Sequence, residues 1–208
     1  MNWPEALPQF SHVNRTWDTT FCMVSAKIRS GQIYVTQNKE SISTVLGSCI
    51  SACIRDPHLG AGGMNHFLLP GEGGVRSNTD SDKVNRSARY GISAMESLIN
   101  EILKLGARKS RLEVKLFGGA KILKSAASNV GQNNIDFVRN FFQVEKIPIA
   151  AEDLGGIHAR RVVYFPNTGR VMVQHPRSIN TNTLAYMETD FEQALCKKDS
   201  TGEIELFD

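Results

Sequence analysis

Alternating apolar and polar positions predict β-strands in the first third of the chain. Residues 23–36 follow this pattern and end in the strictly alternating sequence IYVT. A second strand region covers residues 44–54 and is interrupted at Gly47. Beyond the interruption, Cys49 and Cys53 share one face of the strand, because side chains an even number of positions apart point the same way. The pattern therefore predicts a sheet with a break just before Cys49.

Apolar residues at intervals of three and four predict helices further along the chain. The clearest helix covers residues 87–105 and is followed by Gly106, a residue type that commonly ends helices. A second helix is predicted over residues 134–144, and a third, amphipathic one in the C-terminal tail. The apolar residues of the tail helix are Met187, Phe191 and Leu195.

Three later segments predict further strands. Residues 111–117 (RLEVKLF) alternate apolar and charged positions, and residues 147–156 are typical of a short strand that leads into a Gly-Gly turn. Residues 161–174 predict a hairpin about the turn sequence PNTG. Helices and hairpin-like strands are mixed along the chain without an internal repeat. The expected fold class is therefore α/β or α+β, in a single domain.

Other segments lack a clear pattern. Residues 1–22 are expected to form a loosely attached N-terminal arm, and residues 23–176 the folded domain. Residues 71–85 (GEGGVRSNTDSDKVN) have almost no apolar side chains, which predicts a surface loop and, because it follows His66, a candidate lid. Residues 177–208 form an acidic C-terminal extension, in which the predicted helix is followed by the strand-like sequence EIELF.

The composition is that of an ordinary globular protein, with 41% hydrophobic and 22% charged residues in a chain of 208. A net charge of +3 is too small to predict binding to nucleic acid. The charge is uneven, however, because seven acidic residues lie beyond residue 177 against two lysines, which leaves a basic body. Such a body favours an acidic partner surface, such as a Glu-rich helix, although a solvated tail explains the same pattern.

Several compartments are disfavoured by the sequence. No apolar run reaches the roughly 18 residues that a membrane-spanning helix needs, and the start MNWPEALPQF lacks the pattern of a secretory signal. The four cysteines do not have the spacing of a disulfide framework. We therefore expect a cytoplasmic protein that is not embedded in a membrane and whose thiols are reduced.

Cys49 and His66 are the candidate catalytic residues. A cysteine acts as a nucleophile in its thiolate form, which a facing imidazole can generate. His66 lies in the sequence GGMNHFLLP, where a solvated histidine is unexpected. Gly47 permits a tight turn whose amides can face an oxyanion, and the hydroxyl of Ser43 or Thr44 can orient the imidazole. A hairpin-like return of the chain is needed to bring the thiol and the imidazole together.

Other interpretations of these residues stay open. A single cysteine on an apolar strand is more often a small core residue than a nucleophile, and Cys53 fits that description. Cys49, Cys53, His58 and His66 also have the ligand types of a tetrahedral zinc site, although their spacing departs from that of the usual paired knuckles. The glycine pairs of the chain do not have the arrangement of a phosphate-binding loop.

Several motifs occur in a fixed order along the chain. They are TVLGSC at residues 44–49, Asp56-Pro57, HFLLP at 66–70, FGGA at 117–120 and AEDLGG at 151–156. Together this ordered set resembles the chemoreceptor glutamine deamidase family, CheD. The resemblance extends from about residue 27 to residue 173.

The resemblance implies a layered α-β sandwich, the fold of bacterial toxin deamidases such as cytotoxic necrotising factor. It also implies a triad with Cys49 as nucleophile, His66 as general base and Thr44 or Ser43 as the third member, without a cofactor or a metal. The implied substrates are glutamine side chains on the cytoplasmic helices of chemotaxis receptors, with receptor methyl esters as a second kind of substrate. The resemblance also implies a CheC-type phosphatase as a second partner.

Two further classes of function remain beside the deamidase. The first is another Cys-His hydrolase, such as a peptidase or amidase, whose site would accept main-chain amides. The second is a regulatory binding module that acts on receptors or on a CheC-type phosphatase while its thiol stays inert.

Overall fold

The computed structural model describes residues 3–69, 80–122, 129–175 and 181–198. Within these ranges the chain forms two five-stranded sheets and three α-helices. Helices and strands are interspersed, and parallel and antiparallel pairings both occur. The architecture is therefore a mixed one, in agreement with the expected α+β class.

The first sheet has the strand order β1-β2-β4-β9-β10. Strands β2 and β4 run parallel, and the other neighbours run antiparallel. The strands are β1 (Asn14–Asp18), β2 (Met23–Lys27), β4 (Ser41–Leu46), β9 (Arg160–Phe165) and β10 (Arg170–Gln174). The predicted hairpin about the PNTG turn is confirmed as β9 and β10.

The second sheet has the order β3-β6-β5-β7-β8, in which only β7 and β8 run parallel. Its strands are β3 (Ile33–Thr36), β6 (Ala61–Asn65), β5 (Ile50–Asp56), β7 (Glu113–Gly118) and β8 (Ile149–Leu154). The central strand β5 is buried at every position except Arg55. The second sheet thus supplies much of the core, and Cys49 lies immediately before its central strand.

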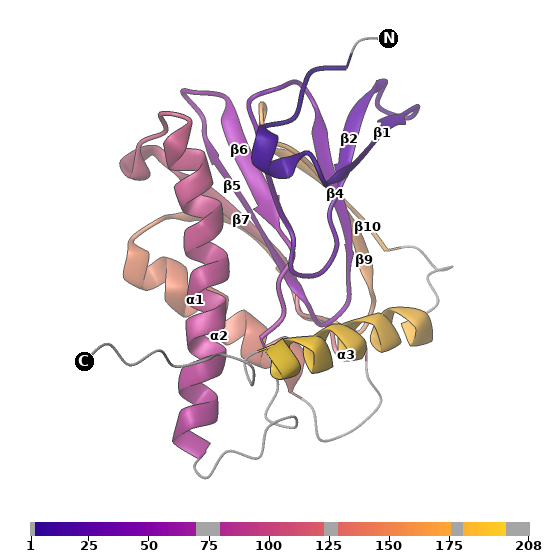
Figure 1. Cartoon of the computed structure of the whole chain (residues 1–208), viewed down its shortest axis with the longest axis vertical. Helices are drawn as coiled ribbons and strands as arrows, with labels where there is room; N and C mark the ends of the chain where they lie inside the picture. The colour runs from indigo at the N-terminus through magenta and orange to yellow at the C-terminus, as the bar shows by residue number, and fades with distance from the viewer. Residues whose placement is uncertain (1–2, 70–79, 123–128, 176–180, 199–208) are drawn as a thin grey trace, which may run out of the picture.

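The helices cover the second sheet on one side and cross the end of the first. Helix α1 (Asp80–Lys104) packs on β3, β5 and β6, and α2 (Val130–Glu145) packs on β5 and α1. Figure 1 shows α1 and α2 beside the second sheet, on the side away from the first. Helix α3 (Thr181–Lys198) instead lies across the lower end of the first sheet. Two short 3-10 helices cover Pro8–Phe10 and Lys109–Arg111.

The strand-like segment 23–36 divides between the two sheets. Its first part is β2 in the first sheet and its last part is β3 in the second. Between them the chain turns at Gly31, which has a φ of +80°. Glycine adopts this left-handed conformation easily, so Gly31 permits the turn between the two strands. The alternation of apolar and polar residues does not indicate this turn.

The glycine-rich segment directly before His66 forms a strand, β6, that the alternation of apolar and polar residues does not predict. It pairs with β3 on one side and β5 on the other, and all its residues are buried. A Cβ added at Gly63 would lie 2.5 Å from the carbonyl oxygen of Tyr34 and 2.9 Å from Leu98 on α1. Glycine is therefore required here because a neighbouring strand and a helix approach the backbone closely.

The N-terminal arm is more firmly attached than the sequence suggested. Strand β1 pairs with β2 along its whole length, and the side chains of Phe10 and Val13 are buried in the core. Arg15 also donates to the buried Glu40 carboxylate at 2.8 Å. The expectation of a loosely attached segment was wrong, because two apolar residues within a polar stretch are enough to anchor it.

The predicted helices are present but longer. Helix α1 begins at Asp80, inside the segment expected to be a surface loop, and α2 begins at Val130. The remainder of the candidate lid, residues 71–79, and the EIELF segment lie outside the described residues. No described helix is both long and apolar enough to cross a membrane.

Asp56 joins the β5–β6 turn to the segment that precedes β7. Its buried carboxylate accepts hydrogen bonds from the backbone amides of His58, Leu59 and Arg108. It also forms an ion pair with Arg111 at 2.5 Å. Removal of this carboxylate leaves several donors without a partner in a region that water enters poorly, which is costly.

We expect Asp56→Ala to lower the free energy of unfolding by about 2–4 kcal/mol, because it breaks a buried, hydrogen-bonded ion pair. Urea unfolding followed by circular dichroism measures the change. Glu152→Ala is the matched control, since it removes a half-exposed ion pair with Arg139 and should cost at most about 1 kcal/mol. Equal midpoints for the two variants would contradict the assignment.

Candidate active site

The segment Gly47–Ser48–Cys49 forms an elbow that carries the chain from β4 in the first sheet to β5 in the second. All three of its carbonyl oxygens accept hydrogen bonds from the body of the protein. The donors are Ala120 N to Gly47 at 2.7 Å, Asn134 Nδ2 to Ser48 at 3.0 Å and Gly119 N to Cys49 at 2.8 Å. These hydrogen bonds fix the orientation of the three peptide groups. The backbone N–H groups of the elbow point away from the body of the protein and converge on one place.

The FGGA motif packs directly against the carbonyl group of Cys49 in this elbow. Gly118 has a φ of +115°, and a Cβ at this position would lie 2.1 Å from the carbonyl oxygen of Cys49. Only a residue without a side chain permits that approach. The motif that carried part of the family resemblance therefore acts as a close-packed support for Cys49, through Gly118 and the amide of Gly119.

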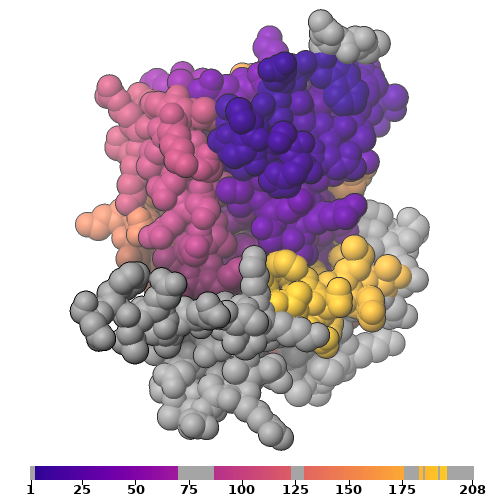
Figure 2. Space-filling model, in the orientation of Figure 1, coloured from indigo at the N-terminus to yellow at the C-terminus, as the bar shows by residue number. Residues whose placement is uncertain are grey.

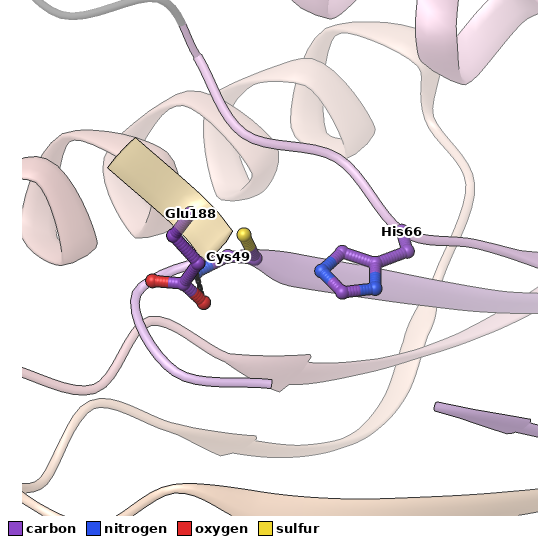
Figure 3. Close-up of side chains that lie close together, drawn as sticks. All are labelled: Cys49, His66 and Glu188. Atoms are coloured by element: carbon purple, nitrogen blue, oxygen red, sulfur yellow. Dashed lines mark hydrogen bonds between the residues drawn. The ribbon is translucent and has the colours of Figure 1, made fainter. Parts of the chain in front are cut away.

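A hairpin brings His66 next to Cys49, as the sequence analysis required. Strands β5 and β6 pair antiparallel, and an isolated bridge joins Ile50 to Phe67. Cys49 and His66 each directly precede one of these paired residues, and their Sγ and ring nitrogen lie within 4.8 Å of each other. Figure 3 shows the sulfur between the imidazole of His66 and the carboxylate of Glu188.

The two candidate hydroxyls differ in what they contact. Thr44 Oγ1 lies 2.8 Å from His66 Nδ1 and also donates to the carbonyl of Ile28 at 2.8 Å. Since the hydroxyl proton goes to Ile28, Nδ1 carries a proton and donates it to Thr44, and Nε2 is left as the basic nitrogen. Ser43 has a different partner, because its Oγ lies 3.3 Å from that of Ser25.

Ser30 is a site residue that the sequence analysis missed. Its Oγ lies 3.2 Å from His66 Nε2, on the ring nitrogen opposite to the Thr44 contact. Ser30 belongs to the turn between β2 and β3, and a serine in a turn carries no signal of a role in catalysis. Its position depends on the turn at Gly31, whose amide donates to the carbonyl of His66 at 2.7 Å.

Glu188 of α3 is the second residue that was missed. Its buried carboxylate accepts hydrogen bonds from every amide of the elbow, at 3.0 Å from Gly47, 3.0 Å from Ser48 and 3.4 Å from Cys49. The Ser48 hydroxyl adds a fourth bond at 2.5 Å. Successive backbone amides that converge in this way form a binding site for an anion.

Both candidate catalytic side chains have strongly shifted pKa values. Burial raises the pKa of the Cys49 thiol, and the Glu188 carboxylate raises it further through its negative charge and its hydrogen bond. Burial lowers the pKa of His66 to about 3. With Glu188 in place, the thiol and the imidazole are therefore both neutral near physiological pH, so Cys49 is not in the thiolate form that a nucleophile requires.

The four candidate zinc ligands are not brought together as a set, although Cys49 and His66 are close. Cys53 lies within β5, and His58 lies in the turn at the far end of the β5–β6 hairpin from Cys49. Among the described residues, the one group of three that suits a metal ion is Cys49, His66 and Glu188. Both carboxylate oxygens of Glu188 already accept hydrogen bonds from the elbow, so this group is better explained by anion binding.

A cavity of about 820 Å³ lies between the body of the protein and α3. Ser30, Thr44 and His66 contribute to its wall from the body, and Leu184, Met187 and Glu188 contribute from the helix. A pocket of this size with His66 in its wall can accommodate several side chains of a second polypeptide. The site is therefore large enough to receive a polypeptide segment.

Comparison with known proteins identifies the family. The sequence profile described as CheD chemotactic sensory transduction matches residues 68–175, just over half of the chain. A protein of Janthinobacterium sp. (strain Marseille) is 50% identical over 196 residues, which cover 93% of this chain and 94% of the relative. The chain belongs to the CheD family. The CheD profile begins two residues beyond His66, so the elbow is matched through the longer alignments.

Other CheD relatives match almost the full chain. A protein of Saccharophagus degradans is 43% identical over 203 residues, or 97% of this chain and 93% of its own. A protein of Halorhodospira halophila is 41% identical over 204 residues, or 98% of this chain and 94% of its own. Each of the three is named a probable chemoreceptor glutamine deamidase. The residues left unaligned in the two longer alignments are fewer than the 18 residues of α3. These two relatives therefore also have a segment that aligns with α3.

The raised pKa of Cys49 predicts how its alkylation depends on pH. We expect iodoacetamide to modify Cys49 very slowly at about pH 7 and to become roughly tenfold faster per pH unit up to and beyond pH 9, because only the thiolate reacts. Peptide mass spectrometry measures this reaction separately from that of the exposed Cys22, which serves as the internal reference. A rate that levels off below pH 8 would instead indicate a resting thiolate–imidazolium pair.

Proposed function

We propose that this chain is a protein-glutamine deamidase that converts glutamine side chains on chemotaxis receptors to glutamate. The observation that carries the proposal is the elbow, where three amides hold a glutamate carboxylate beside a cysteine and a histidine. A glutamate is the product of such a reaction, and its carboxylate resembles the carboxamide of the substrate. The names of the CheD relatives supply the identity of the target proteins.

The first half of the reaction is acyl transfer to sulfur. His66 Nε2 takes the proton of the Cys49 thiol, and the sulfur attacks the carboxamide carbon of the glutamine. The carboxamide oxygen becomes an oxyanion that accepts hydrogen bonds from the amides of the elbow, in the place now taken by Glu188. His66 then returns its proton to the departing amine, which leaves as ammonia, and a thioester remains.

The second half is hydrolysis of that thioester. A water molecule gives its proton to His66 while its oxygen attacks the acyl carbon, and the same amides again hold the oxyanion. Collapse of the intermediate breaks the carbon–sulfur bond, and the proton on His66 returns to the sulfur of Cys49. The product is a glutamate side chain. A methyl ester has the same acyl carbon and releases methanol by the same steps.

Thr44 is proposed as the third member of the triad. Its hydroxyl oxygen accepts the Nδ1 proton of His66 and so keeps Nε2 unprotonated and directed at Cys49. A neighbouring group that fixes the tautomer of a catalytic histidine is a common requirement of this chemistry. Ser43 lacks this contact. Ser30, at Nε2, is proposed to hold the imidazole in place until the thiol proton is transferred.

Three broader expectations belong with this proposal. The two sheets joined at a cysteine elbow are compatible with the fold of bacterial toxin deamidases, and we propose a common architecture with them. The proposed receptor substrates expose their helices in the cytoplasm, so we propose that the chain acts there. A CheC-type phosphatase is proposed as a partner that would compete with receptors for the same cavity.

Replacement of the nucleophile tests the proposed reaction. We expect wild-type protein to convert glutamines of a purified receptor cytoplasmic fragment to glutamate with release of ammonia. Cys49→Ala should lower this rate by at least about a thousandfold, because no other thiol among the described residues faces His66. Cys53→Ala is the matched control and should retain most of the activity. Mass spectrometry of the fragment measures conversion, and equal rates for wild type and Cys49→Ala would refute the nucleophile.

The same assay distinguishes the other classes of function. Cleavage of the fragment backbone would identify a peptidase. Binding of the fragment without any conversion by the wild-type chain would favour the regulatory module.

The two hydroxyls of β4 are separated by a paired substitution. We expect Thr44→Val to lower kcat by at least about tenfold, since the imidazole loses the acceptor that fixes its tautomer. Thr44→Ser keeps the oxygen and should recover most of the rate, whereas Ser43→Ala should have little effect. Steady-state deamidation of the receptor fragment measures all three variants. A larger loss for Ser43→Ala than for Thr44→Val would reverse the assignment.

A further inference from the structure

Helix α3 packs against the active site with one face. Leu184, Met187, Glu188 and Phe191 recur at the three- and four-residue spacing of a single helix face, and all of them border the cavity. The ring of Phe191 lies on the turn at Gly31, where an added Cβ would be 2.7 Å from its Cζ. Figure 2 shows α3, in yellow, against the lower edge of the N-terminal part of the protein, in purple.

The contact between α3 and the elbow of residues 47–49 requires a carboxylate on the helix. Each oxygen of Glu188 faces two donors of the elbow, and Gly47 has no side chain to obstruct them. A Cβ at Gly47 would lie 2.8 Å from Glu188 Oε1, so the absence of a side chain is what lets the carboxylate reach the backbone. An ordinary surface helix does not place a buried acid against the amides beside a nucleophile.

The wall of the cavity that belongs to the body is basic. Lys27, Arg29 and Arg161 all line it. Helix α3 presents the carboxylate of Glu188 to this wall, in keeping with the basic body and acidic tail of the sequence. Opposite charges on the two sides favour the docking of an acidic helix.

We propose that α3 occupies the groove in which the substrate helix binds, with Glu188 as an internal copy of the reaction product. This inference rests on the proposed deamidase function. The groove then selects an acidic amphipathic helix that carries its glutamine at the position of Glu188. A large apolar residue lies three positions after that glutamine, as Phe191 does.

The arrangement also makes α3 a competitor of the substrate. While Glu188 occupies the amides of the elbow, no carboxamide oxygen can use them, and its negative charge opposes ionisation of Cys49. A receptor helix must therefore displace α3 before the reaction begins. Helix α3 belongs to the same chain as the groove, so its effective concentration there is high.

A direct test converts the product copy into a substrate copy. In a Glu188→Gln chain, the introduced carboxamide occupies the elbow beside Cys49, and the proposal predicts that the chain deamidates itself at this position. Peptide mass spectrometry over time should show the introduced glutamine becoming glutamate. Gln193, which is exposed on the same helix, is the matched internal control and should stay unchanged. The double variant that also carries Cys49→Ala should keep both glutamines.

The outcomes separate this inference from the proposed function. Conversion of the introduced glutamine that depends on Cys49 supports both. If that glutamine persists while the same sample converts glutamines of the receptor fragment, the product-copy interpretation of α3 is overturned and the deamidase function stands. If the wild-type chain converts no glutamine in the receptor fragment and the introduced glutamine also persists, the proposed function fails.

A second test detects the docking of α3 without any catalysis. We expect Glu188→Ala to accelerate iodoacetamide alkylation of Cys49 by about tenfold or more, the change that one unit of thiol pKa produces. Asp190→Ala removes an exposed acid of the same helix and should leave the rate unchanged. A chelator is present throughout, so a bound metal cannot be the cause of protection. Equal rates for wild type and Glu188→Ala would overturn the proposal.

Discussion

The proposed active site depends on how the backbone of one elbow is fixed. Hydrogen bonds from Gly119, Ala120 and Asn134 hold the three carbonyls of residues 47–49, so their amides converge on the opposite side. An anion site of this kind needs no charged side chain, because the dipoles of successive peptide groups supply it. The elbow also joins the two sheets, and distortion of either sheet would therefore alter the geometry of the amides.

Much of this arrangement follows from local sequence patterns, and the rest does not. Alternation located β4 and β5, and the break at Gly47 indicated the elbow, because these signals arise from residues close in the chain. The strand before His66 was hidden, since its glycines reflect the approach of β3 and α1 instead of a strand propensity. The contact of Glu188 joins residues 139 positions apart, and no local pattern encodes such a contact.

Burial has opposite consequences for the pKa values of the two reactive groups. It favours the neutral thiol of Cys49 and the neutral imidazole of His66, and the carboxylate of Glu188 strengthens the first effect. A site in this state is protected from adventitious chemistry but is poorly prepared to attack an amide. Exchange of α3 for a substrate helix removes a negative charge from beside the sulfur. Access to the elbow and activation of the nucleophile are thereby coupled to one event, the displacement of a helix.

In the proposed mechanism, deamidation passes through a thioester on Cys49, and this intermediate can be trapped. Hydroxylamine attacks thioesters readily and converts the acyl group to a hydroxamate. When a receptor fragment is incubated with the chain and hydroxylamine, we expect the converted positions to carry hydroxamate, in a share that grows with hydroxylamine concentration. The fragment alone should carry none. Conversion to glutamate alone at every hydroxylamine concentration would contradict the covalent mechanism.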